Sequence, residues 1–263
     1  MAHATFISAT PCPEQTIASI ARVSNPANQQ SDQFASLLRY CIRHQHWSIF
    51  EHAHMTIEIR TSRAITAQIL RHRSFTFQEY SQRYAVVVEQ PAPPELRRQD
   101  TRNRQNSFPD LPAALVDGYT NRISGLFTEI YGLYREMIAD GVAKESARFI
   151  LPLAAPSTMY MTGNIRSWIH YIQLRSAHGT QKEHQDVALE CRNIFIQHLP
   201  AISGALGWFP PSPTSLGSES GSLREVTRPQ QDDDRPMHRA THIEPSVEKH
   251  VESLTIGAPS GIC

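Results

Sequence analysis

The chain has 263 residues, and its 25 lysines and arginines balance 25 aspartates and glutamates, so the formal net charge is zero. A neutral chain argues against a nucleic-acid-binding surface that extends over the whole chain and against a polybasic membrane-binding surface. The first of the 12 glycines is Gly118, which excludes a Rossmann fingerprint or a Walker P-loop from residues 1–117, because both need glycine backbone at the phosphates.

Helical and extended patterns alternate in the first part of the chain. Residues 31–44 have helical spacing, and Ser31 or Asp32 can cap the start of this helix. Residues 50–60 alternate between apolar and polar side chains, which predicts a strand with one buried face. The apolar side of this strand consists of Ala53, Met55, Ile57 and Ile59. Residues 62–73 return to helical spacing, with Ile65, Ile69 and His72 along one stripe.

A loop and a long helix follow. Residues 84–88 are a short β-rich run, and residues 89–112 contain prolines and arginines without a period, which predicts a loop or lid. Apolar residues then repeat at three and four over 111–140, which predicts a long helix ended by Gly141. Its expected apolar stripe consists of Leu115, Tyr119, Ile123, Leu126, Ile130, Leu133 and Met137.

The remaining predicted elements are a short helix over 143–151, an extended segment over 156–162, a helix over 164–175 and a helix over about 180–199. From residue 210 the chain is rich in proline, glycine and serine and lacks aromatic residues, a composition typical of disorder. We therefore predict an α/β (α+β) domain over 1–209, with a mixed sheet flanked by helices and a long central helix. Residues 210–263 are predicted to be a disordered tail.

Cysteine usage and the chain's first residues bear on location. The four cysteines are scattered and form no CxxC pair, which is typical of free thiols in a reducing cytoplasm. The first residues lack a basic region followed by a long apolar core. No apolar run approaches the roughly 18 residues that a membrane span needs. We therefore expect a cytoplasmic protein without a membrane segment.

The densest group of chemically active side chains lies in residues 68–84. Its polar members are Gln68, Arg71, His72, Arg73, Thr76, Gln78, Glu79, Ser81 and Arg83. The apolar face of the preceding helix brings this segment into the protein, where buried guanidinium groups need anions that Glu79 alone cannot supply. Phosphate could supply the missing charge, because the guanidinium fork matches it. The alternatives are a solvated helix end, where cations are favoured, and a nucleic-acid patch.

A second polar group lies in the C-terminal half. It consists of Arg148, Asn164, Arg166, His170, Arg175 and Gln181. Asn164 and Arg166 lie in the first turn of the predicted 164–175 helix, where backbone N–H groups also favour an anion. Asn164 could equally be a plain N-cap.

Two further patterns suggest other functions. The histidines His44, His46, His52 and His54 form an HxH-x5-HxH pattern. This pattern could indicate a metal site, although the nearest carboxylates lack a recognised ligand spacing, so we expect no metal. The arginines Arg97, Arg98, Arg102 and Arg104 could indicate a nucleic-acid module. Against that module stand the neutral charge and the absence of interleaved aromatic residues, so we expect no nucleic-acid partner.

The segment RHRSFTFQEYS at 71–81 resembles the RHR-x7-S signature of the flavin-dependent thymidylate synthases. Flanking segments that resemble motifs of the same family are ARVSN at 21–25, HWSIFEH at 46–52, ARFILP at 147–152, GNIRSWIHYIQLR at 163–175 and GTQKEH at 179–184. The resemblance extends over about residues 1–205 and leaves out the tail.

The resemblance implies the activity and the assembly. Members of the family make dTMP from dUMP, taking a methylene from methylenetetrahydrofolate and a hydride from FAD that NADPH has reduced. The family also implies a homotetramer of α/β subunits with active sites shared between subunits. The scheme needs no protein nucleophile, and Ser81 has no base nearby on its own segment, so we interpret it as a ligand for phosphate or substrate.

The resemblance also assigns site residues by position. Those expected to hold FAD are Ser48, Arg71, His72, Arg73, Glu79, Asn164, Ile165, Arg166 and His170. Those expected to hold dUMP are Gln68, Arg71, Glu79, Tyr80, Ser81, Gln82, Arg83, Arg148 and Arg175. Arg175 is expected to favour ionisation of the uracil ring, and His46 to position folate and flavin. Gln82 stands where the family often has glycine, and its backbone N–H remains available to bind phosphate.

Overall fold

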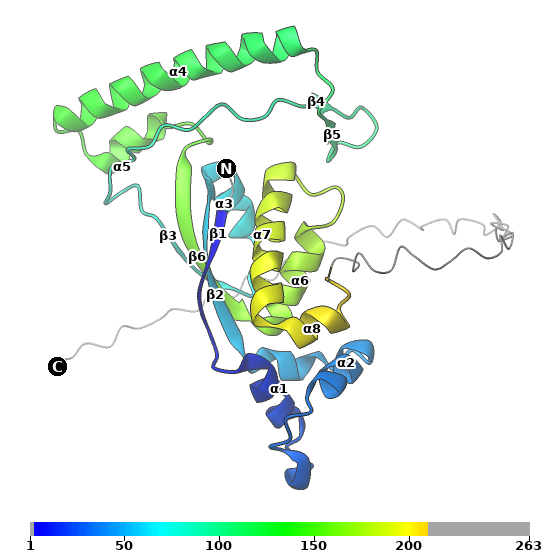
Figure 1. Ribbon diagram of the computed structural model, residues 1–263. Helices are drawn as coiled ribbons and strands as arrows, with labels where there is room; N and C mark the ends of the chain where they lie inside the picture. The colour runs from blue at the N-terminus through cyan, green and yellow to red at the C-terminus, as the bar shows by residue number, and fades with distance from the viewer. Residues whose placement is uncertain (1–2, 210–263) are drawn as a thin grey trace, which may run out of the picture. The chain divides into compact units, whose positions relative to one another are not determined.

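The computed structural model describes residues 3–209, and its core is a four-stranded sheet in the order β1-β2-β6-β3 (Figure 1). The strands are β1 (His3–Ala9), β2 (His54–Ser62), β3 (Thr76–Glu79) and β6 (Pro156–Asn164). The buried positions of β2 alternate as predicted, because Met55, Ile57 and Ile59 are all nearly inaccessible to water. Strand β2 starts four residues later than the predicted strand, since Trp47–Glu51 form the short 3₁₀ helix η2.

The expected α/β fold is confirmed, but the sheet is antiparallel throughout rather than mixed. Strands β2 and β3 run in the same direction and are joined through the helix α3 (Arg63–Ile69), as in a βαβ unit. They do not pair, because β6 inserts between them and runs the opposite way. A strand from late in the chain therefore occupies a central place in the sheet.

Helices cover one face of the sheet. Helix α6 (Ile165–Arg175) starts where β6 ends and runs back along it, and α7 (Lys182–His198) packs beside α6 and against β1 and β2 (Figure 1). The other helices at the lower end of the sheet in Figure 1 are α1 (Pro13–Ala21), α2 (Ala35–Arg43) and α8 (Pro200–Ala205). The opposite face of the sheet carries polar side chains such as Glu58 and Tyr160, whose hydroxyl donates to the Glu58 carboxylate at 2.8 Å.

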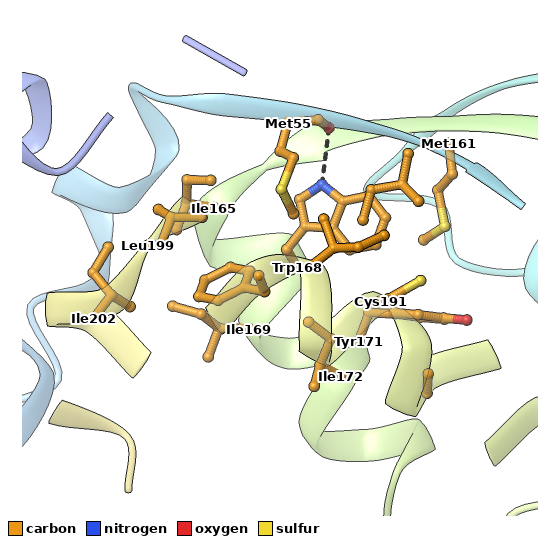
Figure 2. Close-up of a cluster of buried hydrophobic side chains, with 14 of the residues drawn as sticks. Met55, Met161, Ile165, Trp168, Ile169, Tyr171, Ile172, Cys191, Leu199 and Ile202 are labelled. Atoms are coloured by element: carbon orange, nitrogen blue, oxygen red, sulfur yellow. Dashed lines mark hydrogen bonds between the residues drawn. The ribbon is translucent and has the colours of Figure 1, made fainter. Parts of the chain in front are cut away.

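Trp168 on α6 is the centre of the packed layer between helices and sheet (Figure 2). Its side chain is fully buried, and its indole Nε1 donates a hydrogen bond to the backbone oxygen of Met55 at 2.9 Å. The Phe75 ring meets it edge-on, at 5.0 Å between ring centroids. Phe75 also lies so close to the backbone of Gly163 that a Cβ there would stand 2.4 Å from the ring. Strand β6 thus needs glycine where the aromatic cluster crosses it.

The long helix α4 (Ala113–Ala139) exists as predicted, but most of its expected apolar stripe faces away from the core. Leu115, Tyr119, Leu126 and Leu133 are between 44% and 55% exposed. The side chains that α4 buries are Phe127, Tyr131 and Tyr134, and the two tyrosines pack with Val87 and Ala147. The helix is therefore apolar on two sides, and one of them has no cover within residues 3–209.

Several smaller elements differ from the sequence expectations. Helix α2 begins at Ala35, so neither Ser31 nor Asp32 caps it. The run 84–88 is not a strand, and the loop 89–112 contains a small hairpin of β4 (Arg98–Gln99) and β5 (Ser107–Phe108). The 143–151 helix divides into α5 (Lys144–Ala147) and the 3₁₀ turn η3 (Arg148–Ile150). A further 3₁₀ turn, η1, spans Pro26–Asn28, and the elements β1, α1, β3 and α8 had no sequence prediction.

Two further predictions concern the tail and membrane-spanning helices. The tail predicted for 210–263 lies outside the described residues. Within residues 3–209, no helix is both long and apolar enough to cross a bilayer.

Candidate functional site

Most of the residues expected to bind ligands fall into three places. The first is a cavity of about 670 Å³ at the start of α6, which we call the α6 cavity. It is lined by Trp47, Glu51, Ser74, Asn164, Arg166, Ser167, Ile169, His170 and Gln173. Aromatic and aliphatic side chains from η2 and α6 therefore share its wall with cationic and amide groups. Three of the residues expected to hold FAD lie here.

The polar groups of the α6 cavity are held by local contacts. Asn164 is the N-cap of α6, since its side-chain oxygen accepts a hydrogen bond from the Ser167 backbone N–H at 2.8 Å. Arg166 forms an ion pair with Glu51, and both side chains are about half exposed. His170 is exposed one turn further along the helix. The side chains of Arg166 and His170 can turn toward a ligand without giving up a buried contact.

Six other residues expected to hold FAD lie outside the wall of the α6 cavity, and two of them, His72 and Glu79, belong to the two places described below. Ile165 is fully buried in the core and its backbone N–H donates to Ala53, so this residue packs rather than binds. Ser48 is exposed on η2, and His46, expected to position folate and flavin, is exposed just before it. Arg71 and Arg73 are exposed in the turn after α3, and neither forms an ion pair within the described part of the chain.

The second place is a cavity of about 210 Å³ beside the end of β3, which we call the Glu79 cavity. It is lined by Arg63, Glu79, Tyr80, Ser81, Gln82 and Arg148. The Glu79 carboxylate forms an ion pair with Arg63 and accepts a hydrogen bond from the Ser157 hydroxyl at 2.7 Å. The side-chain nitrogen of Gln82 is buried here and has no hydrogen-bond partner among the described residues. A buried amide without a partner is costly, so this cavity is suited to a ligand that offers an acceptor.

Contacts around the Glu79 cavity shape the loop that follows β3. The Tyr80 hydroxyl donates to the backbone oxygen of Val86 at 2.8 Å, which closes the loop. The Ser81 hydroxyl accepts a weak contact from the Arg83 backbone N–H at 3.4 Å. Arg83 forms a half-exposed ion pair with Glu145 at 3.1 Å, so its side chain is turned toward α5. An anion in the cavity would compete with Glu145 for this guanidinium.

The third place lies where α3 ends beside the end of α6, and we call it the Arg175 cluster. It consists of Gln68, His72, Arg175, Gln181 and His184. Arg175 Nε donates to His72 Nε2 at 2.9 Å, so His72 is a neutral acceptor. Burial, followed by the positive charge of Arg175, lowers the pKa of His72 from 6.5 to about 4. Within residues 3–209, Arg175 has no carboxylate partner.

We expect this cluster to make the fold sensitive to acid. Burial lowers the pKa of the fully buried His184 from 6.5 to about 4, so the unfolded chain binds its proton at a higher pH than the folded chain does. The free energy of unfolding should therefore fall as the pH drops from about 6.5 toward 4. The loss from His184 alone is about 2 kcal/mol at pH 5.

Urea unfolding at pH 7.0 and pH 5.0, at one protein concentration, measures this loss. The control is His184→Phe, which retains the other titrating groups, including the buried Glu14 carboxyl, whose pKa burial raises. The variant should lose about 2 kcal/mol less than the wild type between the two pH values. Equal losses would contradict the prediction.

Several residues of these sites were missed from the sequence: Arg63, His184 and the α6-cavity residues Trp47, Glu51, Ser74, Ser167, Ile169 and Gln173. Arg63 is the first residue of α3, where the helix dipole disfavours a cation. A cation at this unfavourable position was the sequence signal that could have marked Arg63 as a binding residue. His184 lies on the buried face of α7, and nothing in its spacing separates it from an ordinary core residue.

Residues that suggested other functions are also placed. The histidines His44, His46, His52 and His54 are exposed. Among residues 3–209, no group of three or more histidine, cysteine, aspartate or glutamate side chains is arranged to hold a metal. Arg97 forms ion pairs with Glu95 and Glu183, and Arg98 forms one with Asp110. Two of the four loop arginines are therefore already neutralised by this chain.

Comparisons with known proteins agree with one another. The family model of the thymidylate synthase complementing protein matches residues 5–201. A probable flavin-dependent thymidylate synthase of Paramecium bursaria Chlorella virus 1 is 55% identical over 196 residues, which cover 74% of this chain and 91% of that protein. A flavin-dependent thymidylate synthase of Synechocystis is 48% identical over 196 residues, covering 74% and 90%.

A solved structure has the same fold. It is a UMP/dUMP methylase, PolB from Streptomyces cacaoi, bound with 5-Br dUMP. The similarity has a TM-score of 0.68 at 23% identity and covers 80% of this chain and 96% of that one.

Proposed function

The chain belongs to the flavin-dependent thymidylate synthase family, and from this premise we propose that it makes dTMP from dUMP by reductive methylation. Methylenetetrahydrofolate is the carbon donor, FAD is the flavin and NADPH reduces it. The observation that carries the proposal is the excess of donors in the Glu79 cavity. Arg63, Arg148 and the buried Gln82 amide together offer more N–H groups than the Glu79 carboxylate can accept hydrogen bonds from. Such an excess of donors suits a phosphate monoester, the group that dUMP carries.

The α6 cavity fits a flavin dinucleotide. Its volume lies within the range of about 300–1,000 Å³ that is common for cofactor sites. Trp47 and Ile169 can pack against a flat ring, while Arg166 and His170 can donate to a pyrophosphate. When bound, FAD supplies the hydride that reduces the transferred carbon.

The residues of this chain bind, orient and polarise the nucleotide. Arg148 and Gln82 hold the phosphate, and Ser81 adds a hydroxyl. The Arg175 guanidinium, which lacks a carboxylate partner in the described part of the chain, stabilises negative charge that develops on the uracil ring. No protein nucleophile takes part. In support, the described contact of Ser81 Oγ is with a backbone N–H and not with a base.

We further propose a homotetramer in which active sites are shared between subunits. Ser157 contacts Glu79 at the start of β6, and Asn164 lines the α6 cavity at its end. They are seven steps apart along the strand, which is roughly 23 Å, whereas reacting atoms must approach to about 3–3.5 Å. The separation supports a site built from the two cavities of different copies. The uncovered apolar side of α4 offers a surface for that contact.

The proposal also extends to organisation and location. We propose that residues 1–209 are the catalytic domain, that the tail 210–263 is outside it, and that the protein acts in the cytoplasm without a nucleic-acid or membrane partner. The three cysteines among the described residues, Cys12, Cys41 and Cys191, are free thiols, which supports a reducing compartment.

Spectroscopy and a turnover assay test the function. The purified protein should be yellow, release FAD on denaturation, and form dTMP from dUMP with NADPH and methylenetetrahydrofolate. Arg148→Ala should weaken dUMP binding by about tenfold or more and leave the flavin absorbance intact, because it removes a charged phosphate ligand. Arg39→Ala, an exposed arginine of α2, is the matched control and should behave as the wild type. A colourless protein that fails to take up added FAD would refute the proposal.

A further inference from the structure

A continuous chain of side-chain hydrogen bonds runs from the loop 89–112 into the core below α6. Its members, in order, are Arg97, Glu183, Gln181, Gln68, His184 and Tyr171. Among them, only Gln68 was expected to touch the nucleotide. The other members come from the loop 89–112, from α6 and from the start of α7, so the chain of hydrogen bonds links these segments to the end of α3.

The outer end of this chain has a fixed polarity. Arg97 can only donate, and its Nη2 gives a hydrogen bond to one Glu183 oxygen at 2.6 Å. Burial opposes ionisation of Glu183, but the hydrogen bonds from Arg97 and Gln181 outweigh it and lower its pKa. Glu183 is therefore a carboxylate that accepts on both oxygens. Its second oxygen accepts from the amide nitrogen of Gln181 at 2.9 Å.

This polarity determines the orientation of every group further in. Because the Gln181 amide nitrogen faces Glu183, its oxygen accepts from Gln68 Nε2, at 2.6 Å. The oxygen of Gln68 then faces His184 Nδ1 at 3.2 Å, so Nδ1 carries the proton.

At the inner end of this chain, the direction of hydrogen-bond donation is also fixed. His184 is neutral and holds a single N–H, so its Nε2 accepts from the hydroxyl of Tyr171 at 3.2 Å. Both side chains are fully buried, and no water can replace a lost partner there. Turning the Gln68 amide over would set oxygen against oxygen at Gln181 and N–H against N–H at His184.

We infer that His184 is a positioning residue that fixes the Gln68 amide with its second N–H free to donate to an acceptor oxygen of the bound nucleotide. The inference rests on the proposed function, which assigns Gln68 to the dUMP site. Gln68 is half-buried beside the Arg175–His72 pair, and the His72 and His184 rings are 6.3 Å apart. His184 itself is buried and acts through Gln68 rather than on the substrate.

A matched pair of variants tests the positioning role. His184→Phe keeps a ring in the core but removes both hydrogen bonds, whereas His184→Asn retains an N–H donor near the place of Nδ1. We expect His184→Phe to raise KM for dUMP roughly tenfold, with kcat and flavin absorbance little changed. His184→Asn should keep KM within about threefold of the wild type. Equal KM values in the two variants would contradict the inference.

Glu183→Gln tests the same role at the outer end, with little risk to the fold. Glutamine can present an N–H to Gln181, so the polarity of the chain is no longer fixed. KM for dUMP should rise by about threefold or more, and an unchanged KM would count against the inference.

A double-mutant cycle separates this inference from the proposed function. If His184 acts through Gln68, then adding His184→Phe to Gln68→Ala should raise KM no further. Penalties that multiply would refute the positioning role while leaving the function intact. A wild-type protein that neither binds nor converts dUMP would refute the proposed function instead.

Discussion

Replacing Arg175 with alanine should lower the rate of dTMP formation at saturating dUMP at least a hundredfold, while the flavin absorbance stays close to that of the wild type. The Arg175 guanidinium is half-buried and has no carboxylate partner among residues 3–209, so its charge is available to a ligand. A single preorganised donor at a developing anion is worth about 10²–10³ in rate.

The contact with His72 allows the role of Arg175 to be separated from simple structural support. Arg175→Lys retains the charge but loses the Nε donor to His72 and the planar fork. It should recover part of the rate that Arg175→Ala loses, and single-turnover measurements of dTMP formation compare the two. Loss of flavin from either variant would instead assign Arg175 to the cofactor or to the fold.

Replacing Trp168 with alanine should lower the free energy of unfolding by about 3–5 kcal/mol, the range for removing a large buried aromatic side chain. Trp168 is fully buried, touches Phe75 and Tyr171, and holds the backbone of β2 through its indole hydrogen bond to Met55 (Figure 2). Its loss leaves a cavity in the layer that joins α6 to the sheet. Urea unfolding at neutral pH measures the change.

Trp168→Phe is the control, because it keeps an aromatic ring while removing the indole N–H. It should cost clearly less than the alanine variant. The backbone oxygen of Met55 would still lose its partner, which costs about 1–3 kcal/mol. If the alanine and phenylalanine variants were equally unstable, the hydrogen bond rather than the packed volume would dominate at this position.

The sequence predicts elements well where one face is buried. The alternation through Met55, Ile57 and Ile59 predicted the strand β2, because a half-buried strand must repeat with a period of two. The Asn164 cap and the helix that follows it were also predicted, since capping is a local property. The apolar stripe on α4 was predicted without a packing partner, because the sequence of a helix that is apolar on two sides does not show which side packs against its own chain.

The structure brings together only part of what the sequence grouped, and the binding roles of these residues stay predictions. The segment 68–84, singled out for its arginines, contributes Gln68 and His72 to the Arg175 cluster and Glu79, Tyr80, Ser81 and Gln82 to the Glu79 cavity, but none of its arginines to either. Ile165 was assigned by its position in the family motif, and its side chain is buried in the core. Arg63 and His184 were missed because their partners lie 16 and 116 residues away in the chain, and such contacts exist only after folding.

The insertion of β6 between β2 and β3 also constrains how the chain reaches its native state. Residues 54–62 pair with residues 156–164, so the central ladder joins segments about a hundred residues apart. Contacts of such long range form slowly, because closing the intervening loop costs conformational entropy before the contacts can compensate for it. During synthesis, the edge of β2 that later pairs with β6 stays unpaired, and its apolar face stays uncovered, until β6 has left the ribosome. A chain that stops before residue 164 is therefore an aggregation hazard rather than a smaller working domain.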